Sequence, residues 1–118
     1  MAKVLVVDDA APMRIMMTEF LSSKGYEVVE AATGAEAVES YKTESPDAVL
    51  LDIAMPDMGG LQVLKEIRKI DPNANVAMVT AMGQQSIVME ALKAGAKDFV
   101  VKPFDADRVL AAIAKIMA

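Results

Sequence analysis

The segment VLVVDDAAP, residues 4–12, joins an apolar run to two acidic residues and a proline. Four consecutive apolar residues rich in valine are typical of a buried strand, and Pro12 fits the first position of a helix, where its missing N–H costs nothing. Between them stand Asp8 and Asp9, whose carboxylates, if about 5 Å apart, would repel by roughly 3 kcal/mol at an effective dielectric of about 20. The pair therefore either points apart into water or holds a cation.

The same apolar pattern recurs along the whole chain. The further runs are YEVV at 26–29, AVLL at 48–51, VAMV at 76–79 and FVV at 99–101. Segments of helical length with 3.6-residue apolar spacing separate them, and this alternation predicts an α/β fold with parallel strands and right-handed crossovers. Since central parallel strands are continuously apolar, Glu27 and Glu30 place the second strand at an edge of the sheet.

Caps and apolar spacing indicate where the helices lie. Thr33 and Glu36 form a capping box that opens the second helix, and Asp105 opens the fifth. Gly25 and Gly95 are expected to end the first and fourth helices. The positions expected to face the core are Met13, Met16, Met17, Phe20, Leu21, Ala37, Val38, Tyr41, Leu64, Ile67, Ile70, Val88, Ala91, Leu92, Val109, Ile113 and Ile116.

Length and composition restrict the class of protein. A chain of 118 residues without linker or repeat is expected to form one domain over 1–118, and to stand alone rather than as part of a longer regulator. The net charge of −5 opposes binding to nucleic acid and to anionic membranes. The chain has no cysteine and no histidine, which excludes disulfides, thiolate metal sites and most zinc sites. Without a signal peptide or a membrane-spanning run, we expect a cytoplasmic protein.

Polar side chains follow the apolar runs of four expected strands. They are Asp8 and Asp9 after the first, Asp52 after the third, Thr80 after the fourth and Lys102 after the fifth. The carboxyl ends of parallel strands meet at one edge, where open sheets bind their ligands, so we expect these side chains to line one crevice. Any one of these polar side chains would be an ordinary feature at the end of a strand. Together, three carboxylates favour a hard divalent cation such as Mg²⁺, and a hydroxyl with an ammonium suits phosphoryl oxygens.

Several stretches make the chain similar to the receiver domains of response regulators, and in particular to their chemotaxis branch. They are LVVDDAAPMR, LLDIAMPDMGG, MVTAMGQQ and AGAKDFVVKPF, which together span the chain. The resemblance implies a flavodoxin-like fold, with a five-stranded parallel sheet in the order 2-1-3-4-5 and helices on both faces. It also implies a phosphorylation-dependent switch of a two-component system. Such a domain catalyses only its own phosphotransfer and slow autodephosphorylation, and is not an enzyme in the usual sense.

The resemblance implies a role for each residue that would meet the phosphoryl group. Asp52 would be the acceptor, forming an aspartyl phosphate. Thr80 would donate a hydrogen bond to one phosphoryl oxygen, and Lys102 would pair with another. A cis peptide bond between Lys102 and Pro103 would aim the lysine at the site.

The resemblance also implies the set of ligands around Mg²⁺. Asp9 would bind the ion directly, Asp8 would bind it mainly through a water, and Asp52 and the backbone carbonyl of Ala54 would complete the protein ligands. The cation would screen the carboxylates from one another and from the incoming phosphoryl group. The aspartate pair of the first segment would thus be half of a magnesium site.

The resemblance further implies that phosphorylation changes the shape of a partner-binding surface. Thr80 would move toward the phosphoryl group, and Phe99, where chemotaxis receivers often have tyrosine, would rotate inward. The face formed by the fourth helix, fifth strand and fifth helix would then change shape. Ala54 and Met82 stand at positions that tune hydrolysis in similar receivers, and neither side chain can orient a water.

Partners and rival functions complete the expectations. The implied phosphodonor is a histidine kinase, and the implied target is a downstream protein such as a flagellar motor component; a phosphatase is a further candidate partner, and the domain is expected to be a monomer. One alternative is a magnesium-dependent aspartyl phosphatase of the haloacid-dehalogenase class, although the D-x-D spacing and the room for a cap are missing. Another is an interaction module that works without phosphate.

Overall fold

The computed structural model describes residues 1–55, 57–81 and 83–118, so the expectation for Met82 lies outside the described residues. Strands and helices alternate five times along these ranges. In chain order they are β1 (Lys3–Val7), α1 (Ala11–Ser23), β2 (Glu27–Ala31), α2 (Gly34–Glu44), β3 (Ala48–Asp52), α3 (Gly60–Ile70), β4 (Val76–Ala81), α4 (Gln85–Lys93), β5 (Asp98–Lys102) and α5 (Ala106–Met117). All strand pairs are parallel, and the order β2-β1-β3-β4-β5 confirms the predicted topology.

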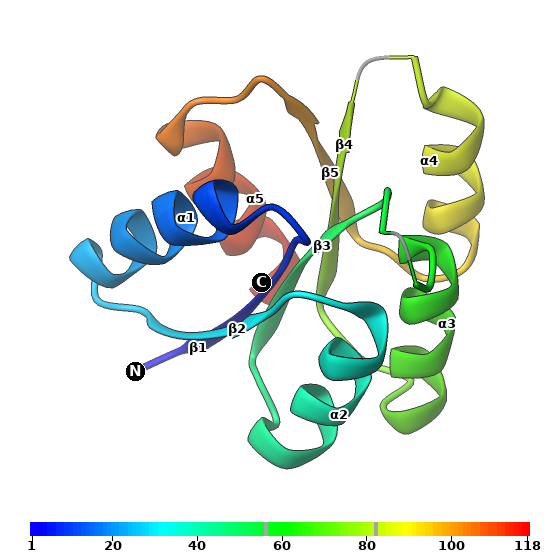
Figure 1. Ribbon diagram of the computed structural model, residues 1–118, viewed down its shortest axis with the longest axis horizontal. Coiled ribbons are helices and arrows are strands. Elements are labelled where there is room, and N and C mark those ends of the chain that lie inside the picture. The colour runs from blue at the N-terminus through cyan, green and yellow to red at the C-terminus, as the bar shows by residue number, and fades with distance from the viewer. Residues whose placement is uncertain (56, 82) are drawn as a thin grey trace.

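Two layers of helices cover the sheet, as Figure 1 shows: α1 and α5 lie on one face, and α2, α3 and α4 on the other. Alternate residues of the strands supply the two cores. Leu5 and Leu51 face the layer of three helices, whereas Val6 and Leu50 face α1 and α5. Because both faces are covered, the central strands are apolar at nearly every position. The edge strand β2 keeps Glu27 and Glu30 exposed, as expected.

Local capping explains several helix ends. The Thr33 hydroxyl accepts a hydrogen bond from the Glu36 backbone N–H at 3.1 Å, and the Asp105 carboxylate accepts one from the Arg108 N–H at 2.9 Å. Both residues are N-caps, as the sequence predicts. Gly95 follows α4 with a φ of +112°, a conformation that side chains rarely adopt. None of the helices in the described ranges is long and apolar enough to cross a membrane.

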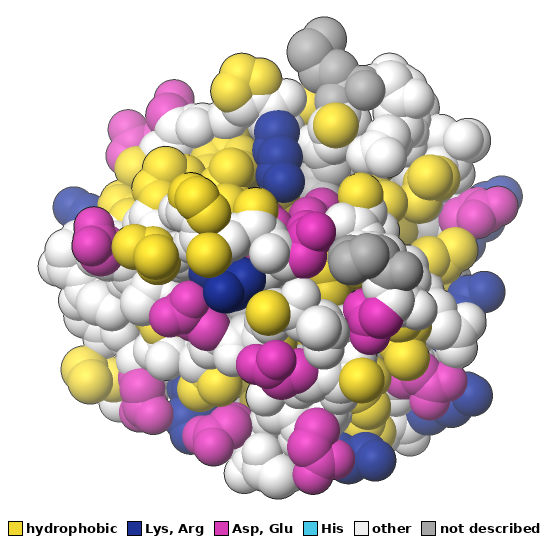
Figure 2. All heavy atoms as spheres, in the orientation of Figure 1, with side chains coloured by type: hydrophobic (Ala, Val, Ile, Leu, Met, Phe, Trp, Pro, Cys, Tyr) yellow, Lys and Arg dark blue, Asp and Glu magenta, His cyan; other side chains and the backbone are white. Residues whose placement is uncertain are grey.

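The expected apolar face of α1 differs from the observed one. Met17 and Leu21 are buried, but Met16, expected in the core, is 48% exposed beside the exposed Ile15. Figure 2 shows hydrophobic side chains gathered over this part of the surface. Pro12 occupies the second helical position rather than the first, because Ala11 already belongs to the helix.

A smaller difference concerns the end of α3. Ile70 was also expected in the core, but it is 40% exposed. It is the last residue of α3, and the backbone becomes extended at the C-cap Asp71. The 3.6-residue spacing thus continues past the point at which the helix stops contacting the core.

Candidate functional site

The carboxyl ends of β1 and β3 bring three carboxylates together. Asp8, Asp9 and Asp52 each offer an oxygen, and these oxygens all lie within 4.8 Å of one another. Asp8 and Asp52 are buried, at 2% and 6% exposure, while Asp9 is exposed to solvent. Within the described residues this is the cluster of acidic side chains with metal-binding spacing, and it is the set that the sequence predicts.

Backbone contacts fix the end of β1 on which Asp8 stands. Its carboxylate Oδ1 accepts a hydrogen bond from the Ala10 N–H at 2.9 Å, and this closes the turn into α1. Its backbone carbonyl accepts a hydrogen bond from Nη1 of Arg14 at 2.7 Å. The same arginine pairs with Glu30 of β2 at 3.4 Å. Arg14 therefore holds the strand end against its neighbour and leaves the Asp8 carboxylate free to face the cluster.

The loop after β3 presents Asp52. Its Oδ1 accepts a hydrogen bond from the Ala54 N–H at 3.2 Å, and the Gly60 N–H donates to the Ile53 carbonyl at 2.8 Å. A Cβ on Gly60 would lie 2.4 Å from the Asp52 carbonyl oxygen, closer than real contacts allow. The second glycine of the MGG motif is thus required by the close approach of α3 to the strand end. The role of the Ala54 carbonyl as a metal ligand stays a prediction.

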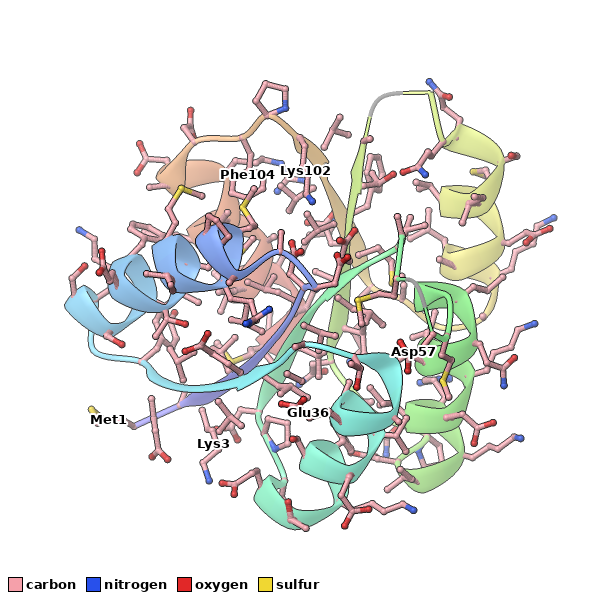
Figure 3. All side chains as sticks on the ribbon, in the orientation of Figure 1. Met1, Lys3, Glu36, Asp57, Lys102 and Phe104 are labelled. Carbon is pink, nitrogen blue, oxygen red and sulfur yellow. The ribbon has the colours of Figure 1, made fainter. Side chains whose placement is uncertain are left out.

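Asp57 ties the far side of this loop to α2, and Figure 3 places its side chain between α2 and α3. Its two carboxylate oxygens accept hydrogen bonds from the Gly34 and Ala35 N–H groups, at 2.9 and 3.2 Å. The first backbone N–H groups of a helix have no internal partner and attract negative charge. These hydrogen bonds, that from Gly34 first, lower the pKa of Asp57. Asp57 thus anchors the loop and is not part of the acid cluster.

Lys102 reaches the cluster from the end of β5. Its Nζ lies 3.5 Å from Oδ2 of Asp8 and 3.7 Å from Oδ2 of Asp52. The Lys102–Pro103 peptide bond is cis, as the resemblance implies. Figure 3 shows Lys102 at the start of the segment that leads to Phe104. A cation is therefore within ion-pair distance of both buried carboxylates.

The surroundings of Asp52 shift the pKa of its carboxyl group. Burial raises the pKa of its carboxyl group, and the nearby Asp8 carboxylate raises it further. The hydrogen bond from the Ala54 N–H and the charge of Lys102 act in the opposite direction. The net result is a raised pKa of Asp52 with burial as its largest cause, and a bound cation would favour the charged form of this carboxyl group.

The donor set fits Mg²⁺. All the side-chain donors are carboxylate oxygens, which hard divalent cations prefer, and nitrogen or sulfur ligands do not enter the described cluster. The three carboxylates each offer an oxygen, and these oxygens are close enough together to be ligands of one ion. Asp8, Asp9 and Asp52 are the residues that would hold it.

Thr80 and Phe99 stand on the neighbouring strands β4 and β5. Thr80, at the end of β4, is 2% exposed, and Phe99 packs partly buried against the core under α4. Both line a cavity of about 310 Å³ between α4 and β5, whose wall also includes Val88 and Leu92. The Thr80 hydroxyl lies 2.7 Å from Oε1 of Gln84 and 3.1 Å from the Ala81 carbonyl. The predicted pair thus shares one cavity, while the coupled motion stays a prediction.

Four supporting residues were missed by reasoning from sequence: Arg14, Asp57, Gly60 and Gln84. Each lies inside a motif that the sequence analysis quoted, but each acts on backbone groups or on a neighbouring side chain rather than on a ligand. Periodicity and residue type predict strand ends and carboxylates. They do not predict which N–H group will donate a hydrogen bond to a carboxylate in a loop, because that depends on how two distant segments pack.

Comparisons with known proteins agree with this geometry. The family model of the response regulator receiver domain matches residues 4–114. The chain is 58% identical over 116 residues to the chemotaxis protein CheY of Bacillus subtilis (strain 168), covering 98% of this chain and 97% of that protein. It is 56% identical over 115 residues to the chemotaxis protein CheY of Thermotoga maritima, covering 97% and 96%. The crystal structure of a response regulator receiver domain protein from Clostridium thermocellum superposes with a TM-score of 0.94 at 31% identity, covering 99% and 94%.

Proposed function

This chain belongs to the response regulator receiver family, and we propose that it is the phosphorylation-dependent switch of a two-component system that serves chemotaxis. The proposal takes residues 1–118 as one receiver domain. The assignment to chemotaxis draws on the similar proteins named CheY, which have nearly the same length. The single observation that carries the chemistry is the placement of Asp52, buried and within ion-pair distance of Lys102, beside two further carboxylates.

The proposed reaction is transfer of a phosphoryl group from a phosphohistidine of a kinase. A carboxylate oxygen of Asp52 attacks the phosphorus, a P–O bond forms, and the P–N bond to the imidazole breaks. The imidazole leaves and takes up a proton. Lys102 would pair with a phosphoryl oxygen, and Thr80 would donate a hydrogen bond to another. When bound, Mg²⁺ would supply positive charge to the carboxylates and to the transferred group.

Receiver domains are signalling proteins, and the output proposed here is a change of surface rather than a released product. The proposed surface is formed by α4, β5 and α5, and the cavity lined by Thr80 and Phe99 lies at its α4–β5 part. The proposed partners are a histidine kinase, a downstream target protein and a phosphatase. We place the domain in the cytoplasm, where it would meet the kinase, and expect it to act as a monomer. Hydrolysis of its own aspartyl phosphate would be slow.

The two alternatives lose support for different reasons. Membership of the receiver family separates the chain from the haloacid-dehalogenase phosphatases. An interaction module without phosphate would not require the full set of three carboxylates, a threonine and a lysine at one edge of the sheet. Asp8 and Asp52 are buried close to one another, and this arrangement of two carboxylates is costly unless a ligand uses it.

Exposure to a small phosphodonor tests the proposal at the level of function class. The protein is mixed with acetyl phosphate and Mg²⁺, and bound and released phosphate are followed over time. A receiver is expected to trap at most one phosphoryl group per chain and to release it slowly. Continuous rapid release would indicate a phosphatase, and no Mg²⁺-dependent trapping would indicate a phosphate-independent module. Either result would contradict the proposal.

A further inference from the structure

The side chain of Gln84, the residue that precedes α4, lies against the end of β4. Its Oε1 is 2.7 Å from Oγ1 of Thr80 and 3.0 Å from the backbone nitrogen of Ala81. Thr80 is almost completely buried. One amide oxygen thus serves two groups at the strand end.

The direction of these hydrogen bonds follows from chemistry. A backbone N–H can only donate, so the atom facing Ala81 must be the amide oxygen of Gln84. An amide oxygen only accepts, so the Thr80 hydroxyl donates to it. The Ala81 carbonyl, at 3.1 Å, is the longer alternative acceptor for the same proton. One acceptor belongs to the last residue of β4 and the other to the N-cap of α4, and among the described contacts the Thr80 hydroxyl makes no hydrogen bond to the acid cluster.

The position of Gln84 makes this contact unusual. Gln84 is the N-cap of α4, where serine, threonine, aspartate and asparagine are preferred because their side chains cap the helix. The Gln84 side chain caps nothing in its own helix and instead reaches back to β4. A residue that departs from the local preference, and uses its polar group on a site residue, points to a role in that site.

We propose that Gln84 is a positioning residue that holds the Thr80 hydroxyl in the resting orientation. The inference rests on the proposed function, in which Thr80 donates to a phosphoryl oxygen on Asp52. The hydroxyl has one proton, so Gln84 and the phosphoryl group compete for it. Gln84 therefore stabilises the resting orientation of the Thr80 hydroxyl. The free energy that phosphorylation must supply to shift the equilibrium from the resting to the active state depends on this contact.

The cavity behind this contact supports a link to the switch. Thr80, Gln84 and Phe99 line the same space of about 310 Å³ between α4 and β5. When Thr80 leaves Gln84, both the amide group and the hydroxyl change their places in the wall that faces Phe99. The competition for one proton is thereby coupled to the space available to the aromatic ring.

A pair of matched variants tests the proposal. Gln84→Met keeps the length and volume of the side chain but removes the acceptor, while Gln84→Glu keeps an acceptor oxygen. Gln85→Met is the control, since Gln85 is the exposed neighbour and contacts Thr80 through no described hydrogen bond. The readout is the concentration of beryllofluoride, a mimic of the phosphoryl group, at half-saturation in Mg²⁺, followed by amide NMR.

Loss of one competing hydrogen bond should make beryllofluoride bind about two- to tenfold more tightly to Gln84→Met than to the parent. Gln84→Glu and Gln85→Met should show no tightening. In a Thr80→Val background, Gln84→Met should have no effect, because the hydroxyl that Gln84 holds is gone. Half-saturation by Mg²⁺ alone should be equal in the parent and Gln84→Met.

Unchanged beryllofluoride binding in Gln84→Met, or a change that persists in the Thr80→Val background, would overturn the proposal. The resting contact is also tested without any ligand, by hydrogen exchange of the Ala81 amide, which should be faster in Gln84→Met than in Gln85→Met. Equal exchange would contradict it. Failure of the parent to bind beryllofluoride would instead contradict the proposed function, so the two failures are distinguishable.

Discussion

The ammonium nitrogen of Lys102 lies 3.7 Å from Oδ2 of Asp52, although β3 and β5 are separated in the sheet by β4. It also lies 3.5 Å from Oδ2 of Asp8. Lys102 thus acts as a counter-ion for both buried carboxylates before any metal binds. The residue expected to contact the phosphoryl group also reduces the repulsion within the resting site.

Replacement of Lys102 by methionine should therefore destabilise the metal-free domain. We expect a loss of about 1–2 kcal/mol in the free energy of unfolding at pH 7, below the cost for a fully buried pair because the lysine is partly exposed. Urea denaturation with and without Mg²⁺ measures this, and Mg²⁺ should recover much of the loss. Lys93→Met, an exposed lysine without a described ion pair, is the control. An equal effect of both substitutions would refute the counter-ion role.

The raised pKa of Asp52 predicts a pH dependence with a definite sign. Since the folded state holds this proton more tightly than the unfolded state, the free energy of unfolding falls as the pH rises from the ordinary aspartate range through the folded-state pKa. Asp52→Asn lacks this loss and should be more stable than the parent by about 1 kcal/mol at pH 7 without metal. Near pH 4 and below, the gain should shrink. A gain independent of pH, measured by urea unfolding, would contradict the assignment.

The two glycines before and at the start of α3 should respond differently to alanine. At Gly60 a Cβ would meet the Asp52 carbonyl at 2.4 Å, so Gly60→Ala should destabilise the domain by about 2 kcal/mol or more and weaken Mg²⁺ binding. At Gly59 a Cβ meets nothing within 4 Å, and its φ of −58° suits alanine. Gly59→Ala should cost no more than about 1 kcal/mol, mainly from the N-cap preference. Thermal unfolding and Mg²⁺ titration of both variants would show whether the close approach holds.

The coupling of Thr80 to Phe99 predicts a separation of phosphorylation from its readout. A charge-assisted hydrogen bond from Thr80 is worth roughly 1.5–3 kcal/mol, which shifts a two-state equilibrium by about ten- to a hundredfold. Thr80→Ala should still accept phosphate but should show weak beryllofluoride-induced amide shifts over residues 91–109. If the variant shows the same shifts as the parent, or if the parent shows none there, the coupling is wrong while the acceptor assignment stands.

The fold was predictable because its signals are local and agree with one another. Continuous apolar runs such as VLVV and AVLL can only be central parallel strands in an alternating pattern, and Glu27 and Glu30 marked β2 as an edge. The proximity of the three carboxylates was predictable because parallel strands place their carboxyl ends at one edge, which brings Asp8, Asp9 and Asp52 together.

The remaining features depend on packing between segments that are distant in sequence. Met16 fits the apolar spacing of α1 but lies on the exposed side, because periodicity defines a stripe without fixing how far the sheet covers it. The sequence did not indicate a role for Gln84, since glutamine before a helix is neither a preferred N-cap residue nor typical of a functional site. Its contacts with Thr80 and Ala81 depend on how the Gln84 side chain packs against the end of β4, which no local sequence pattern records.

The central claim is that Asp52 accepts the phosphoryl group, and locating the adduct tests it most directly. The protein is treated with acetyl phosphate and Mg²⁺ and examined by mass spectrometry of the intact chain and of its peptides, alongside Asp52→Asn and the control Asp57→Asn in the same loop. We predict one Mg²⁺-dependent phosphoryl adduct on the peptide that contains Asp52, retained in Asp57→Asn and absent from Asp52→Asn. An undiminished adduct in Asp52→Asn would contradict the account.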